Sequence, residues 1–168
     1  MFLKKNNTLL MAIKRLMSEY KQYTKDPNPF YSIEPSEKDM FVWNVLLFGP
    51  SATIFEGGIF QCQFKFSSEY PNKPPEFKFL TNFPHPNIYT DGKVCISILH
   101  EGKDQYNYED ISERWNPSHS VNSILMSLIS ILSEPNFESP ANVDASKLWR
   151  DDFNKYKNII YKFVSNNN

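Results

Sequence analysis

Cysteine is scarce in this sequence, which has only Cys62 and Cys95 among its 168 residues. Two cysteines are too few for a disulfide scaffold, and the first residues do not have the pattern of a secretory signal. This combination is typical of a reducing compartment. We therefore expect the protein in the cytosol, the nucleus or both.

Long apolar runs are also missing. The apolar run from Leu9 to Ile13 is followed at once by Lys14 and Arg15, and it is too short to span a bilayer. We expect no direct membrane insertion.

An excess of charge of one sign is absent as well. The sequence has 18 Lys and Arg against 19 Asp and Glu, a formal net charge of −1 at pH 7. Such a chain has no overall field that would draw it onto nucleic acid or an anionic membrane. We therefore expect no nucleic-acid partner.

What is present is the composition of a globular protein, with 40% hydrophobic and 15% aromatic residues. The length suits one domain, whose core can be held by burial without disulfides or metal. We see no internal repeat and no linker.

The spacing of apolar residues predicts a helix over residues 8–24. Its stripe consists of Leu9, Ile13, Leu16, Met17 and Tyr20, and Asp26-Pro27-Asn28-Pro29 ends it.

After this helix, apolar residues recur at every second position, as in a β-strand. Phe60, Cys62, Phe64 and Phe66 alternate with polar residues, which predicts a half-buried antiparallel strand. Runs at 30–34, 41–47 and 76–80 complete an expected four-stranded meander.

Helical spacing returns in the last third, where Ser120 is the expected N-cap of a helix from Val121 to Leu132. Two further helices are expected at 143–149 and 151–163. One helix, a run of strands and then about three helices predicts an α+β fold with an antiparallel meander sheet.

The two thiols differ in their surroundings. Cys62 lies on the same strand face as three phenylalanines, so we interpret it as a small core residue. Cys95 follows the turn signature Tyr89-Thr90-Asp91-Gly92-Lys93. The pattern alone leaves open whether Cys95 is structural or is exposed to a partner.

Two other kinds of site compete at Cys95. A cysteine protease or phosphatase needs a neighbouring base or an anion cradle, and neither His85 nor His100 sits in such a motif. A zinc site would have to combine His85, Cys95, His100 and His119, without the usual ligand spacing. We expect no metal site.

Prolines flank His85 and restrict the backbone up to Asn87. A rigidly held Asn amide can donate to an oxyanion, and the loss of one such donor typically costs about 2.7–4 kcal/mol of barrier. The alternative is a side-chain hydrogen bond that ties down a turn.

His85-Pro86-Asn87, followed by Cys95, resembles the active-site signature of ubiquitin-conjugating enzymes. The segments 70–75 (YPNKPP) and 115–117 (WNP) resemble two further motifs of that family, in the same order. The resemblance extends from about Thr8 to Val164. We therefore expect a single ubiquitin-conjugating catalytic domain over 8–164, with flexible ends at 1–7 and 165–168.

The resemblance implies that Cys95 carries ubiquitin as a thioester and passes it to a lysine. It implies that Asn87 stabilises the oxyanion or braces the active-site loop, and that His85 supports this loop. The family binds no cofactor, since the upstream activating enzyme uses the ATP. The implied partners are ubiquitin, the ubiquitin-activating enzyme, a RING-type ubiquitin ligase and protein substrates.

The sequence between Cys95 and Trp115 is about a dozen residues longer than in minimal family members. An acidic insertion here resembles the branch that builds lysine-48-linked chains in endoplasmic-reticulum-associated degradation, which would place the protein at the cytosolic face of that membrane. The alternative is a solvated loop. Its acidic residues are Glu101, Asp104, Glu109, Asp110 and Glu113.

Two positions depart from the family pattern. Many members have an Asp where this chain has Ser139, so acidic influence would come from Glu138 or the insertion. Asn72 replaces a large apolar residue that many relatives present to RING ligases. The expected ligase-binding residues, which could also be an ordinary solvated surface, are Lys14, Arg15, Ser18, Lys73, Pro117 and Ser118.

Two other functions remain open within the family. The chain could conjugate a different ubiquitin-like modifier, or it could be a non-catalytic member that acts as a binding module. Members of the second kind lose the cysteine, whereas this chain retains both Cys95 and Asn87.

Overall fold

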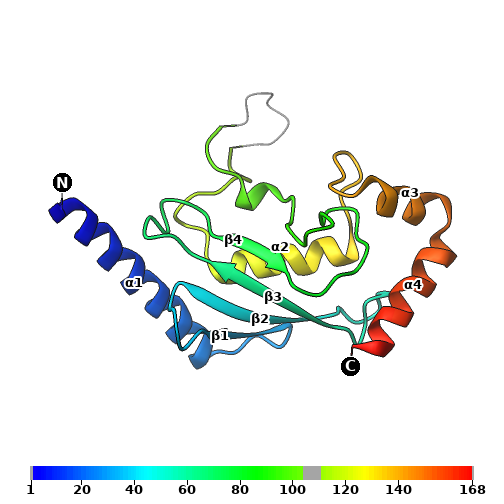
Figure 1. The fold of residues 1–168 in the computed structure, drawn as a ribbon, viewed down its shortest axis with the longest axis horizontal. Helices are drawn as coiled ribbons and strands as arrows, with labels where there is room; N and C mark the ends of the chain where they lie inside the picture. The colour runs from blue at the N-terminus through cyan, green and yellow to red at the C-terminus, as the bar shows by residue number, and fades with distance from the viewer. Residues whose placement is uncertain (1, 104–110, 168) are drawn as a thin grey trace.

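The computed structural model of the chain describes residues 2–103 and 111–167 (Figure 1). The first helix, α1, is followed by a run of strands and then by the remaining helices. The elements are α1 (Phe2–Lys25), β1 (Tyr31–Pro35), β2 (Val42–Phe48), β3 (Ile59–Lys65), β4 (Glu76–Phe79), the 3-10 helix η1 (Ser97–Leu99), α2 (Val121–Ser133), α3 (Val143–Asp151) and α4 (Phe153–Asn166). The expected α+β fold is confirmed.

Within the described residues, the strands form one antiparallel sheet in the order β1-β2-β3-β4. Opposite each other across β2 and β3 lie Trp43 and Phe64, and Val45 and Cys62. These four side chains are buried, at most 2% exposed, because the strand period places them all on the core face. The predicted alternation over 60–66 is confirmed.

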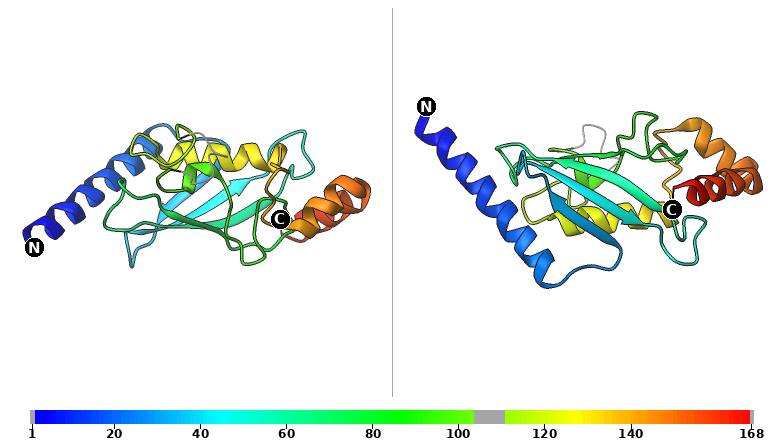
Figure 2. Two further views of the ribbon diagram at one scale, coloured as in Figure 1. Left: turned by 90° about the horizontal axis from the view of Figure 1, so that it is seen from above. Right: turned by 60° about the horizontal axis from the view of Figure 1, so that its bottom comes forward.

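Helix α2 lies across the sheet, whereas α1 and the α3–α4 pair stand at opposite ends of the molecule (Figures 1 and 2). The predicted cap of α2 is confirmed, since Ser120 Oγ accepts from Ser123 N at 3.2 Å. Its core-facing residues are Val121, Ile124, Leu125, Leu128, Ile129 and Leu132. Ile131, on the same helix, is only partly buried.

The predicted boundaries and inward face of the first helix need correction. The chain is helical from Phe2, six residues before the expected start. Leu9 and Met17 are 39% and 61% exposed, whereas Ala12 and Leu16 are buried. The amino-terminal part of α1 projects past the sheet (Figure 1), so no core selects its apolar face.

The last helix also extends beyond its predicted end. Helix α4 runs from Phe153 to Asn166, three residues past the expected end at 163. The Ser165 hydroxyl donates to the Tyr161 carbonyl at 2.8 Å. Among the described helices, none combines the length and the apolar character that crossing a bilayer requires.

Candidate active site

Cys95 and Asn87 lie side by side in a short hairpin. The Cys95 amide donates to the Asn87 carbonyl at 3.0 Å, and Ile88 pairs with Val94 in an antiparallel bridge. Tyr89 N then donates to Lys93 O at 2.8 Å, which closes the turn. The seven residues between Asn87 and Cys95 therefore fold back so that the two residues lie together in space.

Gly92 joins this hairpin to the sheet. Its φ of +87° lies in the left-handed region, and its carbonyl accepts from the Phe79 amide at 2.9 Å. A Cβ at this position would lie 2.1 Å from the Phe79 carbonyl oxygen. Only glycine allows the turn to approach β4 so closely.

The Asn87 side chain is 2% exposed and is bound at both ends to the backbone of Asn136. Its Nδ2 donates to the Asn136 carbonyl at 2.7 Å, and its Oδ1 accepts from the Asn136 amide at 2.9 Å. In this arrangement the amide braces the segment between α2 and α3 against the hairpin.

His85 lies beneath the hairpin and is fully buried. Its Nδ1 accepts from the Asn87 amide at 3.1 Å, so Nε2 carries the hydrogen that it donates to the Ile131 carbonyl at 3.0 Å. Burial lowers the pKa of His85 to about 4, although the Ile131 carbonyl opposes this shift. The ring is therefore neutral near pH 7, and both its nitrogens are engaged.

Cys95 is partly exposed, whereas Cys62 is buried. Burial raises the pKa of the Cys62 thiol well above its ordinary value, so it stays protonated and enclosed. Beside Cys95 lies Tyr89, which is 47% exposed. Electrostatic interaction with Cys95, a hydrogen bond to it, burial and the charge of Asp91 together raise the pKa of Tyr89. The exposed cysteine thus has a phenol as its neighbour.

Glu138 and Ser139 are exposed on the segment that Asn87 braces, and Glu138 N donates to Asn136 Oδ1 at 2.9 Å. Of the acidic insertion, Glu101 and Glu113 are described and exposed. The remaining members, Asp104, Glu109 and Asp110, lie outside the described residues.

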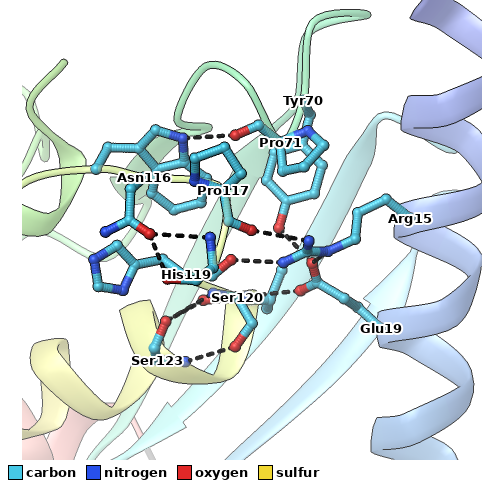
Figure 3. A network of polar contacts seen from close by, with 12 residues as sticks. Arg15, Glu19, Tyr70, Pro71, Asn116, Pro117, His119, Ser120 and Ser123 are labelled. Carbon is cyan, nitrogen blue, oxygen red and sulfur yellow. Dashed lines mark hydrogen bonds and ion pairs between the residues drawn. The ribbon is translucent and has the colours of Figure 1, made fainter. Parts of the chain in front are cut away.

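The expected ligase-binding residues come from three segments: α1, the turn at 70–75 and the loop before α2. Lys14, Ser18 and Lys73 are exposed, as are Pro117 and Ser118. Arg15 differs, because its guanidinium donates to the Pro117 and His119 carbonyls at 3.0 and 2.7 Å (Figure 3). Arg15 is thus committed to contacts within the protein.

Three residues at these sites were not identified from the sequence. Asn136 binds Asn87 through its backbone, so its residue type carries no signal for this contact. Tyr89 stands in the sequence only as part of a turn signature. Glu19 follows Arg15 by one helical turn, but its partners Tyr70 and Val121 are far away in sequence.

In the described part of the chain, no group of three or more His, Cys, Asp or Glu side chains is placed to hold a metal ion. What this site offers is an accessible thiol on a rigid hairpin, next to a phenol and a backbone-bound amide. Such a thiol can take part in acyl transfer.

Comparison with known proteins agrees with this chemistry. A family model described as "Ubiquitin-conjugating enzyme" matches residues 15–164. Ubiquitin-conjugating enzyme E2-18 kDa of Schizosaccharomyces pombe is 50% identical over 156 residues, which cover 92% of this chain and 94% of that protein. Human ubiquitin-conjugating enzyme E2 G2 is 49% identical over 155 residues, 91% and 94% of the two chains. Arabidopsis thaliana ubiquitin-conjugating enzyme E2 7 is 46% identical over 151 residues, 89% and 91% of the two chains.

Proposed function

The chain belongs to the ubiquitin-conjugating enzyme family, and from this premise we propose that Cys95 carries ubiquitin between the activating enzyme and a lysine. The protein is a ubiquitin-conjugating enzyme, and its family uses no cofactor of its own. Ubiquitin, an activating enzyme and a ligase are the general partners of this family. We propose one catalytic domain over 8–164.

The observation that carries the assignment to Cys95 is its position. It is the partly exposed thiol of the two, and its amide is hydrogen-bonded to the Asn87 carbonyl. In the first step the Cys95 thiolate attacks the ubiquitin thioester on the activating enzyme and displaces that enzyme's thiolate. In the second step a neutral lysine amine attacks the new thioester. The tetrahedral adduct loses a proton and expels the Cys95 thiolate, which leaves an isopeptide bond.

This second step needs little base catalysis because the acyl group is already activated and the acceptor is held close. Asn87 supports it by fixing the hairpin relative to segment 134–142, and an N–H of its amide could also serve a developing oxyanion. Glu138, Ser139 and Tyr89 lie on the segments joined in this way.

We further propose lysine-48-linked chain formation with a RING-type ligase, in proteasomal degradation at the cytosolic face of the endoplasmic reticulum. Sequence identities of 50% and 49% to two ubiquitin-conjugating enzymes support the assignment to this family. The acidic insertion, with its exposed ends at Glu101 and Glu113, supports the finer assignment. The expected ligase contacts are Lys14, Ser18, Lys73, Pro117 and Ser118, with Arg15 acting through the loop that it binds.

The test is charging with activating enzyme, ATP and ubiquitin, alongside parallel reactions with other ubiquitin-like modifiers and their activating enzymes. We expect a ubiquitin adduct that reducing agent removes. Cys95→Ser should give an adduct that resists reduction, because an ester replaces the thioester. Cys62→Ala should charge normally. Charging that persists in Cys95→Ala would show that another residue carries the modifier.

A further inference from the structure

Glu19 is a carboxylate held inside the protein at the junction of three segments. Its side chain is only 11% exposed. Oε1 accepts from Arg15 Nε and, at 2.6 Å, from the Tyr70 hydroxyl, and Oε2 accepts from the Val121 amide at 2.7 Å (Figure 3). One carboxylate thus joins α1, the turn at 70–75 and the first residue of α2.

Arg15 extends this junction into the loop before α2. Its two terminal nitrogens donate to the Pro117 and His119 carbonyls, on either side of Ser118. Within the loop, Asn116 Oδ1 accepts from the Ser118 amide at 3.0 Å. The exposed Pro117-Ser118 corner is therefore held from α1.

Tyr70 extends the junction into the proline-rich turn. Its ring is 1% exposed, and the neighbouring Pro71 carbonyl accepts from Trp115 Nε1 at 2.8 Å. Burial, together with the charge of Glu19, raises the pKa of Tyr70, so the phenol remains a donor. Lys73, exposed on this turn, pairs with Glu69 at 2.8 Å.

We propose that Glu19 is a positioning residue for the ligase-docking surface, which holds the 70–75 turn and the 117–119 loop in one preassembled arrangement. The inference rests on the proposed function, because that function makes these two segments the place where a RING domain docks. Glu19 itself need not contact the ligase. Its effect is to remove the cost of ordering two loops at the moment of binding.

The contacts divide this role between three residues, and the division can be tested. Glu19→Gln turns an acceptor into a partial donor that faces the Arg15, Tyr70 and Val121 donors, so both loops should loosen. Tyr70→Phe keeps the buried ring and should loosen only the turn. Arg15→Gln should loosen the loop more than the turn, because Arg15 binds the loop carbonyls directly and reaches the turn only through Glu19 and the Tyr70 ring. Glu37→Gln removes one exposed carboxylate on the link between β1 and β2 and is the matched control.

Hydrogen exchange measures the loosening without any ligase. The reporter amides are those of Lys73, bonded to the Glu69 carbonyl, and of His119, bonded to the Asn116 carbonyl. Glu19→Gln should speed exchange at both by roughly tenfold or more, the scale of one hydrogen bond to a charged group. Tyr70→Phe should speed exchange mainly at Lys73, and Arg15→Gln should speed exchange mainly at His119. Unchanged exchange in Glu19→Gln would overturn the proposal, and Tyr70→Phe and Arg15→Gln decide it if Glu19→Gln does not fold.

Ligase-stimulated discharge measures the consequence for docking. A panel of purified RING domains is screened with the charged wild-type protein, and the domain that most accelerates discharge onto lysine is titrated. Glu19→Gln should raise the half-saturating RING concentration by several-fold, while the stimulated rate at saturation recovers. A purely destabilising role would not give this split. Equal titration curves for Glu19→Gln and wild type would also overturn the proposal.

The proposed function and the positioning role of Glu19 can fail separately. If wild type does not charge, or no RING domain accelerates its discharge, the proposed function fails in that respect. Exchange at Lys73 and His119 would still decide whether Glu19 holds the two loops. If wild type responds to a RING domain and the variants match it in both measurements, only the positioning role fails.

Discussion

His85 and Asn87 are buried polar side chains, and both are satisfied almost entirely by backbone groups. The Asn87 amide closes a pair of hydrogen bonds with Asn136, and the His85 ring joins the Asn87 amide to the Ile131 carbonyl. Removing either side chain leaves buried backbone groups without partners, which is more costly than losing the hydrogen bond alone.

We predict that Asn87→Ala affects both stability and transfer. The loss of two buried bonds should cost roughly 1–3 kcal/mol, which corresponds to a lower melting temperature by several degrees in a chain of this size. Single-turnover discharge onto lysine should slow as well, because segment 134–142 is no longer fixed to the hairpin. Melting and discharge are measured on the same charged sample. A large melting loss with normal discharge by the folded fraction would leave Asn87 a structural brace only.

His85 should make stability depend on pH. The unfolded chain binds its proton with an ordinary pKa near 6.5, and the folded chain does so only near 4. Unfolding therefore takes up a proton between these pH values. The contribution of neutral His85 to the free energy of unfolding is complete above about pH 6.5, and it is lost as pH falls toward 4. The total is about 3 kcal/mol.

Denaturant unfolding of wild type and His85→Gln between pH 7.5 and 4.5 checks this prediction. The difference in unfolding free energy between the two proteins should shrink as pH falls. A constant difference between wild type and His85→Gln would contradict a buried neutral imidazole.

Among the elements, the hairpin from Ile88 to Val94 sets the position of the thiol. It is attached to β4 by the hydrogen bond between the Phe79 amide and the Gly92 carbonyl. It is attached to α3 less directly, since the Asn142 amide donates to the Pro86 carbonyl at 2.9 Å. The position of Cys95 thus depends on turn geometry rather than on a long regular element.

Gly92→Ala should therefore disturb activity, and Gly102→Ala is a matched control. Both glycines have positive φ, +87° and +68°, so each alanine carries a similar backbone penalty of about 1 kcal/mol. Only Gly92→Ala also forces a Cβ against the Phe79 carbonyl, whereas a Cβ at Gly102 meets nothing within 4 Å. We expect slower charging and a larger fall in melting temperature for Gly92→Ala. Equal effects of the two substitutions would show that the turn has no special role.

At the scale of the whole molecule, the docking surface and the thiol lie on different segments, and the insertion follows Cys95 and precedes Trp115 in the chain. Both described ends of the insertion carry exposed acids, Glu101 and Glu113. Negative charge there would attract a basic surface of the acceptor ubiquitin. It would also favour the ammonium form of the attacking lysine, so capture and activation oppose each other.

We predict that, at low salt, attraction of the acceptor ubiquitin to the acidic insertion outweighs the stabilisation of the ammonium form of its lysine. Replacing Glu109, Asp110 and Glu113 by their amides should slow chain formation while charging stays nearly normal. The difference in the rate of chain formation between this variant and wild type should diminish as ionic strength rises, because the Debye length falls to about 8 Å near 0.15 M. Three exposed acids far from the insertion in sequence are neutralised together as the control: Glu34 on β1, Glu37 on the link between β1 and β2, and Glu76 on β4. Unchanged chain rate and linkage in the first triple variant would mean that the insertion is only a solvated loop.

The local sequence pattern predicted the buried face or the start of an element correctly where that element packs along its whole length against the core. The alternation at Phe60, Cys62 and Phe64 predicts the buried face of β3, and Ser120 predicts the start of α2, because each signal acts over a few residues. Pattern was insufficient for α1, where Leu9 and Met17 are apolar but exposed. The sheet covers only part of that helix, so apolar spacing overstates its buried face.

The element order, the motif His85-Pro86-Asn87 and the candidate thiol could all be read from the amino-acid sequence. The contacts of the polar side chains became known only from the fold. Asn87 binds the backbone of Asn136, 49 residues away, and Glu19 binds Val121, 102 residues away. Backbone amides and carbonyls are the same at every residue, so no residue type marks them as partners before the fold brings them together.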